Sequence, residues 1–358
     1  MIFGKYPTGF FGIEEEFFIL NQDLKPTPKV DIFLKSIPRS LLTNKIIYHE
    51  FHKSQIEINS GVCENIDQAK QDITYLRNIL KDIAKKNNLN LAAIGTHPTA
   101  DWKDGILNPN YIRNIERRQQ YQAYLTCGMH IHFSMPNAVT ACKTINALQY
   151  LIPFLIPLTA NSPFENNKYR YTQDQRIKII EQAHTIKNKT YAGIAPKDLT
   201  NSLNINNWTK LKKSVNIPMY WDIRPNLKYG TIEFRTFDVQ PSAEHSTSFA
   251  QLLQILIHEI MRKNLGIPYI SRQQLFELRN CAIKDGMKAI FKTNTIKDYW
   301  TKLLIPFIKD ALSKYTISKK DIDPTLKLIK KNFAQQQIEI FQKTKNLNKI
   351  TEKFTKSF

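Results

Sequence analysis

An alternation of apolar and polar residues predicts the first strand of the chain, between residues 9 and 20. Three consecutive carboxylates, Glu14, Glu15 and Glu16, lie inside this β-prone run. Because side chains on a strand alternate between its faces, Glu14 and Glu16 share a face that Glu15 does not. Two carboxylates on one face repel each other and need cations or basic groups opposite them. The pattern therefore predicts half of a divalent-metal site, and the simpler alternative is an edge strand whose glutamates face water.

A second strand is predicted from residue 54 to residue 59, with two isoleucines on one face and Glu57 on the polar face. The alternative for Glu57 is a position that simply faces solvent. Glu64 follows the next turn, where two placements are open. It either folds back toward the polar face of this strand or leads the helix predicted at residues 67–85, where an acid is ordinary.

A third predicted strand, around residues 126–133, places His130 and His132 on one face. Two imidazoles two residues apart can offer nitrogen ligands to a metal, or donors to a phosphate, at one point. A lone histidine is usually structural. A His-x-His strand in a chain that also has a Glu-x-Glu strand favours a shared functional site.

The last strand of this kind follows a turn at Gly230 and carries Glu233 and Arg235 on one face. An ordinary cross-strand ion pair, worth under about 1 kcal/mol if exposed, is one interpretation. The other is a metal-binding carboxylate beside a guanidinium that binds phosphate.

Helical spacing of apolar residues accounts for most of the remaining chain. It predicts helices at residues 30–42, ended around Pro38, and at 67–85, 111–124, 141–159, bent at its prolines, 173–184, 246–263 and 272–291, and in about three amphipathic segments after residue 296. His97 ends a short buried strand and is interpreted as a loop residue, not a ligand. The polar, turn-rich segment 165–216 is interpreted as a lid or substrate loop. We expect a catalytic domain at residues 1–290 and a basic helical C-terminal region at residues 291–358 packed on it.

The composition of the chain limits the class of protein but does not identify a partner. The chain has 358 residues, of which 42% are hydrophobic, and is therefore long enough for one large or two medium cores. Its net charge of +20 would suit nucleic acid, an acidic membrane surface or anionic substrates. The sequence has no nucleic-acid-binding motif, so we expect small-molecule substrates and no nucleic acid.

Cysteine spacing and hydropathy predict the compartment. The four cysteines form no Cys-x-x-Cys pair, which argues against a zinc knuckle or a disulfide framework and suits a reducing cytoplasm. The longest apolar stretch, residues 147–160, is interrupted by prolines and is shorter than the roughly 20 residues of a membrane span. The N-terminus shows no secretory signal pattern. We expect a soluble cytoplasmic protein with no membrane partner.

Six motifs, in this order, resemble those of the type 2 glutamate–cysteine ligase family, also called carboxylate–amine ligases. They are Gly12-Ile-Glu-Glu-Glu-Phe, Glu57-Ile-Asn-Ser-Gly-Val-Cys63, Cys127-Gly-Met-His-Ile-His132, Asn161-Ser-Pro-Phe164, Trp221-Asp-Ile-Arg-Pro225 and Thr231-Ile-Glu-Phe-Arg235. The resemblance covers roughly residues 9–290. It implies a glutamine synthetase-like α+β fold, in which a curved antiparallel sheet forms an active-site funnel with helices outside and a helical C-terminal region.

The resemblance also implies a role for each candidate residue. The implied metal ligands are Glu14, Glu16, Glu57, Glu64, His130 and Glu233. His132 and Arg235 would lie near the ATP phosphates or the phosphorylated carboxylate, as catalytic and nucleotide-binding groups. Arg176 and Arg224 would hold the carboxylate of the acid substrate.

The implied reaction uses ATP with Mg²⁺ or Mn²⁺ to convert a carboxylate, expected to be the γ-carboxylate of glutamate, into an acyl phosphate. An amine, cysteine by default, then attacks to give an amide. A homodimer is compatible with the resemblance. The sequence departs from the family pattern at residues 166–171, where a glycine-rich stretch is expected, and at residues 334–337, where arginine is expected. A metal-dependent amide hydrolase and a non-catalytic or regulatory member of the ligase fold are the alternatives.

Overall fold

The computed structural model describes residues 3–109, 125–186, 189–190, 192–195, 220–262, 270–315 and 317–358. The helix predicted at residues 111–124 lies outside the described residues. So does most of the predicted lid after residue 186.

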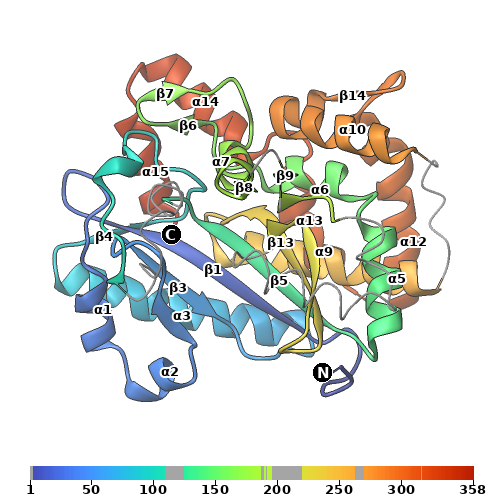
Figure 1. The fold of residues 1–358 in the computed structure, drawn as a ribbon, viewed down its shortest axis with the longest axis horizontal. Coiled ribbons are helices and arrows are strands. Elements are labelled where there is room, and N and C mark those ends of the chain that lie inside the picture. Colours follow the sequence, from blue (N-terminus) through green and yellow to red (C-terminus); the bar gives the residue numbers. More distant parts are fainter. Residues whose placement is uncertain are drawn as a thin grey trace.

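In the described ranges, seven strands form one sheet in which all the pairs are antiparallel. The order is β12-β13-β5-β1-β3-β2, and β4 pairs with β1 at its end. Figure 1 labels β13, β5, β1, β3 and β4 of this sheet. The strands are β1 (Phe11–Leu20), β2 (Ile47–His49), β3 (Gln55–Asn59), β4 (Asn90–Ala92), β5 (Gly128–Ser134), β12 (Ile223–Asn226) and β13 (Thr231–Asp238). The long strand β1 lies inside the sheet, so an edge strand with water-facing glutamates is the wrong interpretation of its sequence.

The register of this sheet aligns the charged positions of separate motifs. Glu16 pairs with Glu57 of β3, and Glu14 pairs with His130 of β5. Across the other edge of β5, His132 pairs with Glu233 of β13. Residues up to 219 positions apart in the sequence therefore meet on one face of four neighbouring strands.

Two long helices, α3 (Ile66–Lys86) and α9 (Ala243–Arg262), pack against the opposite face. Glu15 points to this side, where it is fully buried and binds the Arg77 guanidinium of α3 through contacts of 2.9 and 2.6 Å. The Ser246 hydroxyl of α9 donates to the same carboxylate. The three consecutive glutamates are thus divided between a helix-covered face and an open face, as the alternation predicted.

Strand β13 carries an irregularity that affects its last residues. Phe234 aligns with Ile131, but Phe237 aligns with Met129, so β13 has one extra residue between them. This β-bulge lets Phe234 and Phe237 both enter the core, where their rings lie 5.8 Å apart. Arg235 and Thr236 are the residues between them.

The remaining described elements surround the sheet. They are α1 (Val30–Ser36), α2 (Arg39–Thr43), α5 (Ala138–Leu148), α6 (Ile152–Thr159), α7 (Gln175–Ala183), α10 (Arg272–Asp285), α11 (Ile296–Tyr299), η7 (Trp300–Leu304), α12 (Ile305–Tyr315), α13 (Lys319–Lys327), α14 (Phe333–Thr344) and α15 (Asn348–Lys356), with short strand pairs β6–β7 (Phe164–Glu165, Lys168–Tyr169), β8–β9 (Thr185–Ile186, Lys189–Thr190), β10–β11 (Ala192–Gly193, Tyr220–Trp221) and β14–β15 (Ile290–Phe291, Asn294–Thr295). The predicted α+β class, with helices outside an antiparallel sheet and a helical C-terminal region, is confirmed.

Several boundaries differ from the prediction for local reasons. The helix predicted from residue 30 ends before Pro38, as expected, and a second short helix, α2, follows that proline. The helix predicted at residues 272–291 ends at Asp285, where Gly286 adopts a φ of +60° that other residues rarely adopt. The segment after residue 296 contains more and shorter helices than predicted. No single helix in the described ranges is both long and apolar enough to cross a membrane; only α5 and α6 taken together reach that length, and they are bent by 73°.

The C-terminal helices are continuous with the rest of the core. Helix α13 packs on α9, and the Trp300 indole donates to the carbonyl oxygen of Phe154 at 2.8 Å. Ile350 and Phe354 of α15 belong to the same hydrophobic cluster as β1. The division of the chain at residue 290 stays a prediction.

Candidate active site

Two cavities open on the face of the sheet that α3 and α9 leave uncovered, within the described part of the chain. The acidic cavity, of about 150 Å³, is lined by four glutamates, His130, Arg235 and Tyr220, among others. The larger cavity has a volume of about 360 Å³ and is bordered by aromatic and apolar residues and by three lysines. Glu14 and Tyr48 line both cavities, so the two spaces adjoin.

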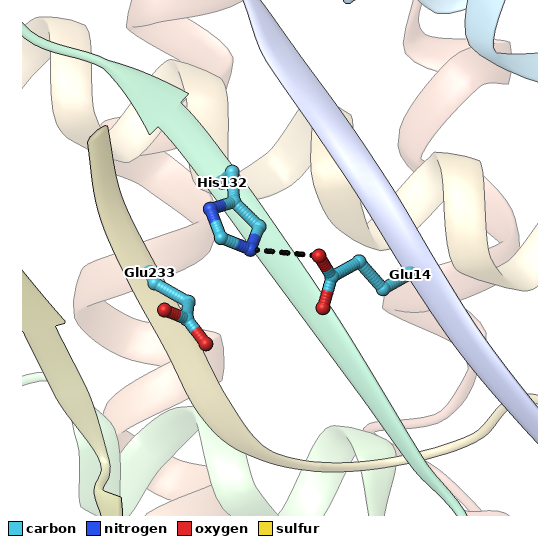
Figure 2. Close-up of side chains that lie close together, drawn as sticks. All are labelled: Glu14, His132 and Glu233. Atoms are coloured by element: carbon cyan, nitrogen blue, oxygen red, sulfur yellow. Dashed lines mark ion pairs between the residues drawn. The ribbon is translucent and has the colours of Figure 1, made fainter. Parts of the chain in front are cut away.

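One group of potential metal ligands consists of Glu14, His132 and Glu233, from strands β1, β5 and β13 (Figure 2). One ligand atom from each lies within 4.8 Å of the others. The Nδ1 atom of His132 lies 3.0 Å from the Thr231 hydroxyl. Its Nε2 atom lies 3.2 Å from Glu14 Oε1 without forming an aligned hydrogen bond. When Nδ1 carries the proton, the Nε2 lone pair faces two carboxylates, which is an arrangement that a cation stabilises.

The ionisation of this group agrees with a cation site. Burial alone would lower the pKa of His132, but the charges of Glu14 and Glu233 outweigh burial and raise the pKa. A proton on Nε2 therefore supplies positive charge between the carboxylates, at the place where a metal ion would supply it. The residues present fit a divalent ion.

Glu233 is the most strongly held member of the group. Arg224 binds it through two contacts of 2.9 Å, Asn226 donates at 2.8 Å, and Arg235 forms an ion pair with it. Burial would raise its pKa, but Arg224 and then Arg235 hold the pKa well below the usual value. Arg224 was predicted to hold the acid substrate. In this structure two of its nitrogen atoms are engaged by Glu233, and the substrate role stays a prediction.

The second group of potential ligands is Glu16, Glu50 and Glu57, whose ligand atoms also lie within 4.8 Å of one another. Glu57 is 97% buried, and its Oε1 atom has no hydrogen-bond partner among the described residues. Burial and then the charge of Glu50 raise the pKa of Glu57 well above its usual value. Three carboxylates at this spacing, two of them buried, cannot all ionise unless a cation joins them, so this group also fits Mg²⁺ or Mn²⁺.

The third member of this group, Glu50, was not predicted from the sequence, and Glu64 was. Glu64 is exposed at the start of α3, where its backbone nitrogen donates to Gln68, and it lies outside both groups. Its placement matches the ordinary helix-leading alternative, and the expectation that it lines the site is corrected. The available signal for Glu50 was the short β-prone run of residues 46–48, since its pairing with β3 brings the residues that follow next to Glu57.

His130 lies between the two groups and belongs to neither. Its Nδ1 atom is 3.2 Å from Glu14, and its Nε2 atom is 3.5 Å from Arg176 and 4.0 Å from Glu16. Burial and then Arg235 lower its pKa to about 4, so the ring is neutral at pH 7. The geometry thus brings His132 into a ligand group and places His130 beside it. The exact division of roles between the two histidines stays a prediction.

Arg176 enters the site from the N-terminal turn of α7. Its guanidinium is fully buried and donates to the backbone carbonyl of Phe237 at 3.1 Å, inside the β13 bulge. It passes so close to Gly128 that a Cβ atom at that position would lie 1.9 Å from Nη2. Arg235 stacks on the Tyr220 ring, with its guanidinium carbon 4.2 Å from the ring centroid. The role of Arg176 toward the acid substrate stays a prediction.

A buried ion pair near the site could not be predicted from the sequence, because its members are far apart along the chain. Arg279 of α10 binds Asp222 through contacts of 2.6 and 2.7 Å, and it also pairs with Glu181 of α7. The pair joins α10 to the segment that precedes β12. No local periodicity marks such a contact.

The two sequence departures lie away from both cavities. Residues 166–171 include the tight turn between β6 and β7, where Asn166 and Asn167 adopt φ values of +48° and +58°. Gln337 is buried on α14 and donates to the backbone and side-chain oxygens of Asn161 at 2.9 and 2.7 Å. Neither segment lines the acidic or the larger cavity. The departures therefore leave the described lining of the site unchanged.

The antiparallel sheet, with one helix-covered face and one acid-lined face, has a glutamine synthetase-like fold. More particularly, the chain belongs to glutamate–cysteine ligase family 2, whose family model matches residues 10–299.

Similar proteins support this membership. A protein of Solibacter usitatus with a provisional glutamate–cysteine ligase 2 name is 28% identical over 97% of this chain and 92% of its own length. A glutamate–cysteine ligase of Natronomonas pharaonis is 29% identical over 71% of this chain and 70% of its own.

Two solved structures share the fold. The glutamate–cysteine ligase of Francisella tularensis, solved in complex with AMP, superposes with a TM-score of 0.62 at 13% identity, over 97% of this chain and 88% of that one. The bifunctional glutathione synthetase of Pasteurella multocida superposes with a TM-score of 0.65 at 14% identity, over 97% of this chain. This chain spans about half (51%) of the length of the Pasteurella protein.

Proposed function

We propose that the protein is an ATP-dependent carboxylate–amine ligase. It activates a carboxylate, expected to be the γ-carboxylate of glutamate, as an acyl phosphate, and an amine then displaces phosphate to give an amide and ADP. Cysteine is the default amine because the family and the relatives are named for it. The observation that carries the proposal is the pair of three-residue ligand groups, Glu14–His132–Glu233 and Glu16–Glu50–Glu57, on one face of the sheet.

The ligand chemistry supports magnesium or manganese. Five of the six side chains offer carboxylate oxygens and the sixth offers one imidazole, with no thiolate among them. When bound, such ions neutralise the triphosphate and the transferred phosphoryl group. The chain's own residues hold these positions through Arg224 on Glu233 and Thr231 on His132.

The larger cavity supports the nucleotide. Its volume of about 360 Å³ lies within the range of small-molecule sites. Phe10, Ile46 and Tyr229 offer apolar surface for a base, while Glu14 and His132 lie where the cavity meets the acidic one. A nucleotide oriented in this way directs its phosphates toward the first ligand group.

The acidic cavity supports the acid substrate. Arg235 borders this cavity and lies beside the first ligand group through its ion pair with Glu233. Its positive charge stabilises the negative oxygens that develop during phosphoryl transfer. Because the surrounding groups are largely buried, the cavity also limits the water that would hydrolyse an acyl phosphate.

A hydroxylamine assay tests the reaction. With ATP, Mg²⁺, glutamate and hydroxylamine, we expect equal amounts of ADP and hydroxamate, because a small strong nucleophile captures the acyl phosphate whatever the natural amine is. Omitting glutamate or Mg²⁺ should abolish both products. ADP release at the same rate without acid, or hydroxamate without ADP, would contradict the mechanism.

The same assay separates the alternatives. A metal-dependent amide hydrolase would turn over without ATP, and a non-catalytic member would form no product with any acid. Reaction with another acid but not with glutamate would change only the substrate.

A further inference from the structure

A buried arginine of α10 binds the segment that carries Tyr220 into the acidic cavity. Arg279 is only 2% exposed, and its guanidinium binds both carboxylate oxygens of Asp222, at 2.6 and 2.7 Å. It also pairs with Glu181 of α7. Burial would lower the pKa of Arg279, but the charges of Asp222 and Glu181 outweigh burial and raise the pKa. The guanidinium therefore stays charged, and its counter-charges come from two separate segments of the chain.

Asp222 lies between two short strands whose side chains form part of the site. It follows β11 and precedes β12. Its backbone nitrogen donates to the carbonyl oxygen of Gly193 at 2.7 Å, and its carbonyl oxygen accepts from the backbone nitrogen of Arg235 at 2.9 Å. The backbone of Asp222 therefore joins the segment before β12 to the Arg235 position of β13.

Tyr220 precedes Asp222 by two residues. Its ring borders the acidic cavity and lies against Arg235, whose guanidinium carbon is 4.2 Å from the ring centroid. In the described ranges, β11 pairs with β10 at two positions. Because so short a two-stranded pairing is marginally stable on its own, it does not fix the strand by itself. The carboxylate of Asp222, held by Arg279, supplies a further constraint.

The groups around this contact are closely packed. Both members of the ion pair and three residues of the candidate site border one cavity of about 10 Å³. They are Arg279, Asp222, Tyr220, Arg235 and Arg176. A space of this size holds about one water molecule, so a shift of Arg279 is transmitted to its neighbours and is not absorbed by empty volume.

We propose that Arg279 is a positioning residue of the active site. By holding Asp222, it fixes the Tyr220 ring against the Arg235 guanidinium at the border of the acidic cavity. The positive charge of Arg235 is thereby kept in place for the oxygens that develop charge during phosphoryl transfer. The placement of the ring follows from the geometry of the protein, whereas the effect on rate rests on the proposed function.

Arg279→Lys tests the kinetic consequence. Lysine keeps a charge but cannot bind both oxygens of Asp222 as the planar guanidinium does. In the hydroxylamine assay kcat should fall about 10- to 100-fold, because a misplacement of about 1 Å is enough for such a loss. The KM for ATP should stay within about twofold of wild type, since Tyr220 and Arg235 lie outside the described lining of the larger cavity.

Arg77→Lys is the matched control. Arg77 is also buried and binds both oxygens of one carboxylate, that of Glu15, but on the helix-covered face. Both variants should lower Tm by similar amounts, and Arg77→Lys should keep kcat within about twofold of wild type when assayed well below its Tm. If Arg279→Lys lowers Tm as the control does and keeps wild-type kcat, the proposal is overturned.

A milder variant covers the case in which Arg279→Lys does not fold. Asp222→Asn keeps the shape of the side chain and weakens its charge-assisted contact with Arg279. Its kcat should fall in the same direction, with the KM for ATP unchanged. A folded Asp222→Asn protein with wild-type kcat would overturn the proposal.

A double-mutant cycle tests whether Arg279 acts through Tyr220. Tyr220→Leu removes the stacked ring and should itself lower kcat. Adding Arg279→Lys should then lower kcat by less than about threefold more, because the ring that Arg279 positions is already absent. A merely structural Arg279 would give independent losses that multiply, and that result would overturn the proposal.

A crystal structure of Arg279→Lys separates this inference from the proposed function. We expect the Tyr220 ring to move until the Arg235 guanidinium carbon lies more than about 6 Å from its centroid, beyond the range of the stacking contact. The movement is visible in a protein without activity, so an inactive wild type would contradict the proposed function and not this placement. An unchanged Tyr220–Arg235 contact in the variant would overturn the inference, even if the wild type is fully active.

Discussion

Glutamates on the two faces of strand β1 have different surroundings. On the helix-covered face, Glu15 is fully buried and its carboxylate is matched by Arg77 and Ser246. On the open face, Glu16 meets Glu50 and Glu57, and one oxygen of Glu57 has no partner in the described part of the chain. The helix-covered charge is paired within the protein, whereas the open-face carboxylates are grouped with one another and fit the cation proposed above.

The largest effect is expected on the helix-covered face. Arg77→Met leaves Glu15 as a buried charge without its cation, which should lower the free energy of unfolding by about 3–5 kcal/mol in urea titrations. The double variant with Glu15→Gln removes both charges and should recover most of the loss. If the double variant is as unstable as the single one, the pair contributes through packing and not through charge.

The same change of charge should have the opposite sign on the open face. Glu57→Gln relieves repulsion among three carboxylates, so the metal-free protein should gain about 1 kcal/mol of stability. Its affinity for Mg²⁺, measured by calorimetry, should fall by about 100-fold. A variant that loses stability in EDTA while keeping wild-type Mg²⁺ affinity would show that Glu57 is structural, like Glu15.

A buried histidine extends the comparison to pH. His97 accepts from two backbone nitrogen atoms and contacts the Leu24 carbonyl, so its partners all lie within the protein, and burial lowers its pKa to about 3. Between pH 6.5 and 3 the unfolded chain binds a proton that the folded chain does not. Stability should therefore fall as the pH falls, by about 2 kcal/mol between pH 7 and pH 5. His97→Gln should lose this part of the slope, and parallel wild-type and variant curves would contradict the assignment.

The smallest effect separates Glu50 from Glu64. Glu50→Gln should weaken Mg²⁺ binding about tenfold, because Glu50 belongs to the second ligand group. Glu64→Gln is the matched control at an exposed position and should stay within about twofold of wild type. An equal loss of Mg²⁺ affinity in both variants would show that Glu64 also contributes to the metal site.

Local alternation was sufficient wherever a whole functional face lay on one strand. It placed Glu14 with Glu16, His130 with His132, and Glu15 on the opposite side from its neighbours. It failed where the information was in the pairing of strands. Glu50 follows a three-residue strand too short to show a period, and only the alignment of Tyr48 with Glu57 reveals its place.

Ion pairs between residues far apart in the sequence could not be predicted from local patterns either. The partners Asp222 and Arg279 are 57 positions apart, and neither is unusual within its own segment. Arg224 shows a related limit, because the chemistry of a side chain does not by itself determine its partner. A guanidinium on a strand suits a substrate carboxylate and a neighbouring glutamate equally, and the cross-strand alignment with Glu233 brings the glutamate next to it.

The bulge in β13 changes which face each later residue reaches. Phe234 and Phe237 are three positions apart, so strict alternation would place them on opposite faces, and the bulge brings both rings to the core. The guanidinium of Arg176 donates to the Phe237 carbonyl within the bulge and thereby holds the irregular backbone in place. Deleting one of the two residues between Phe234 and Phe237 would leave the rings two positions apart, so regular pairing with Ile131 and Met129 would keep the same facing and remove only the bulge. A strand without the bulge would therefore lose the backbone geometry to which Arg176 donates while keeping both rings in the core.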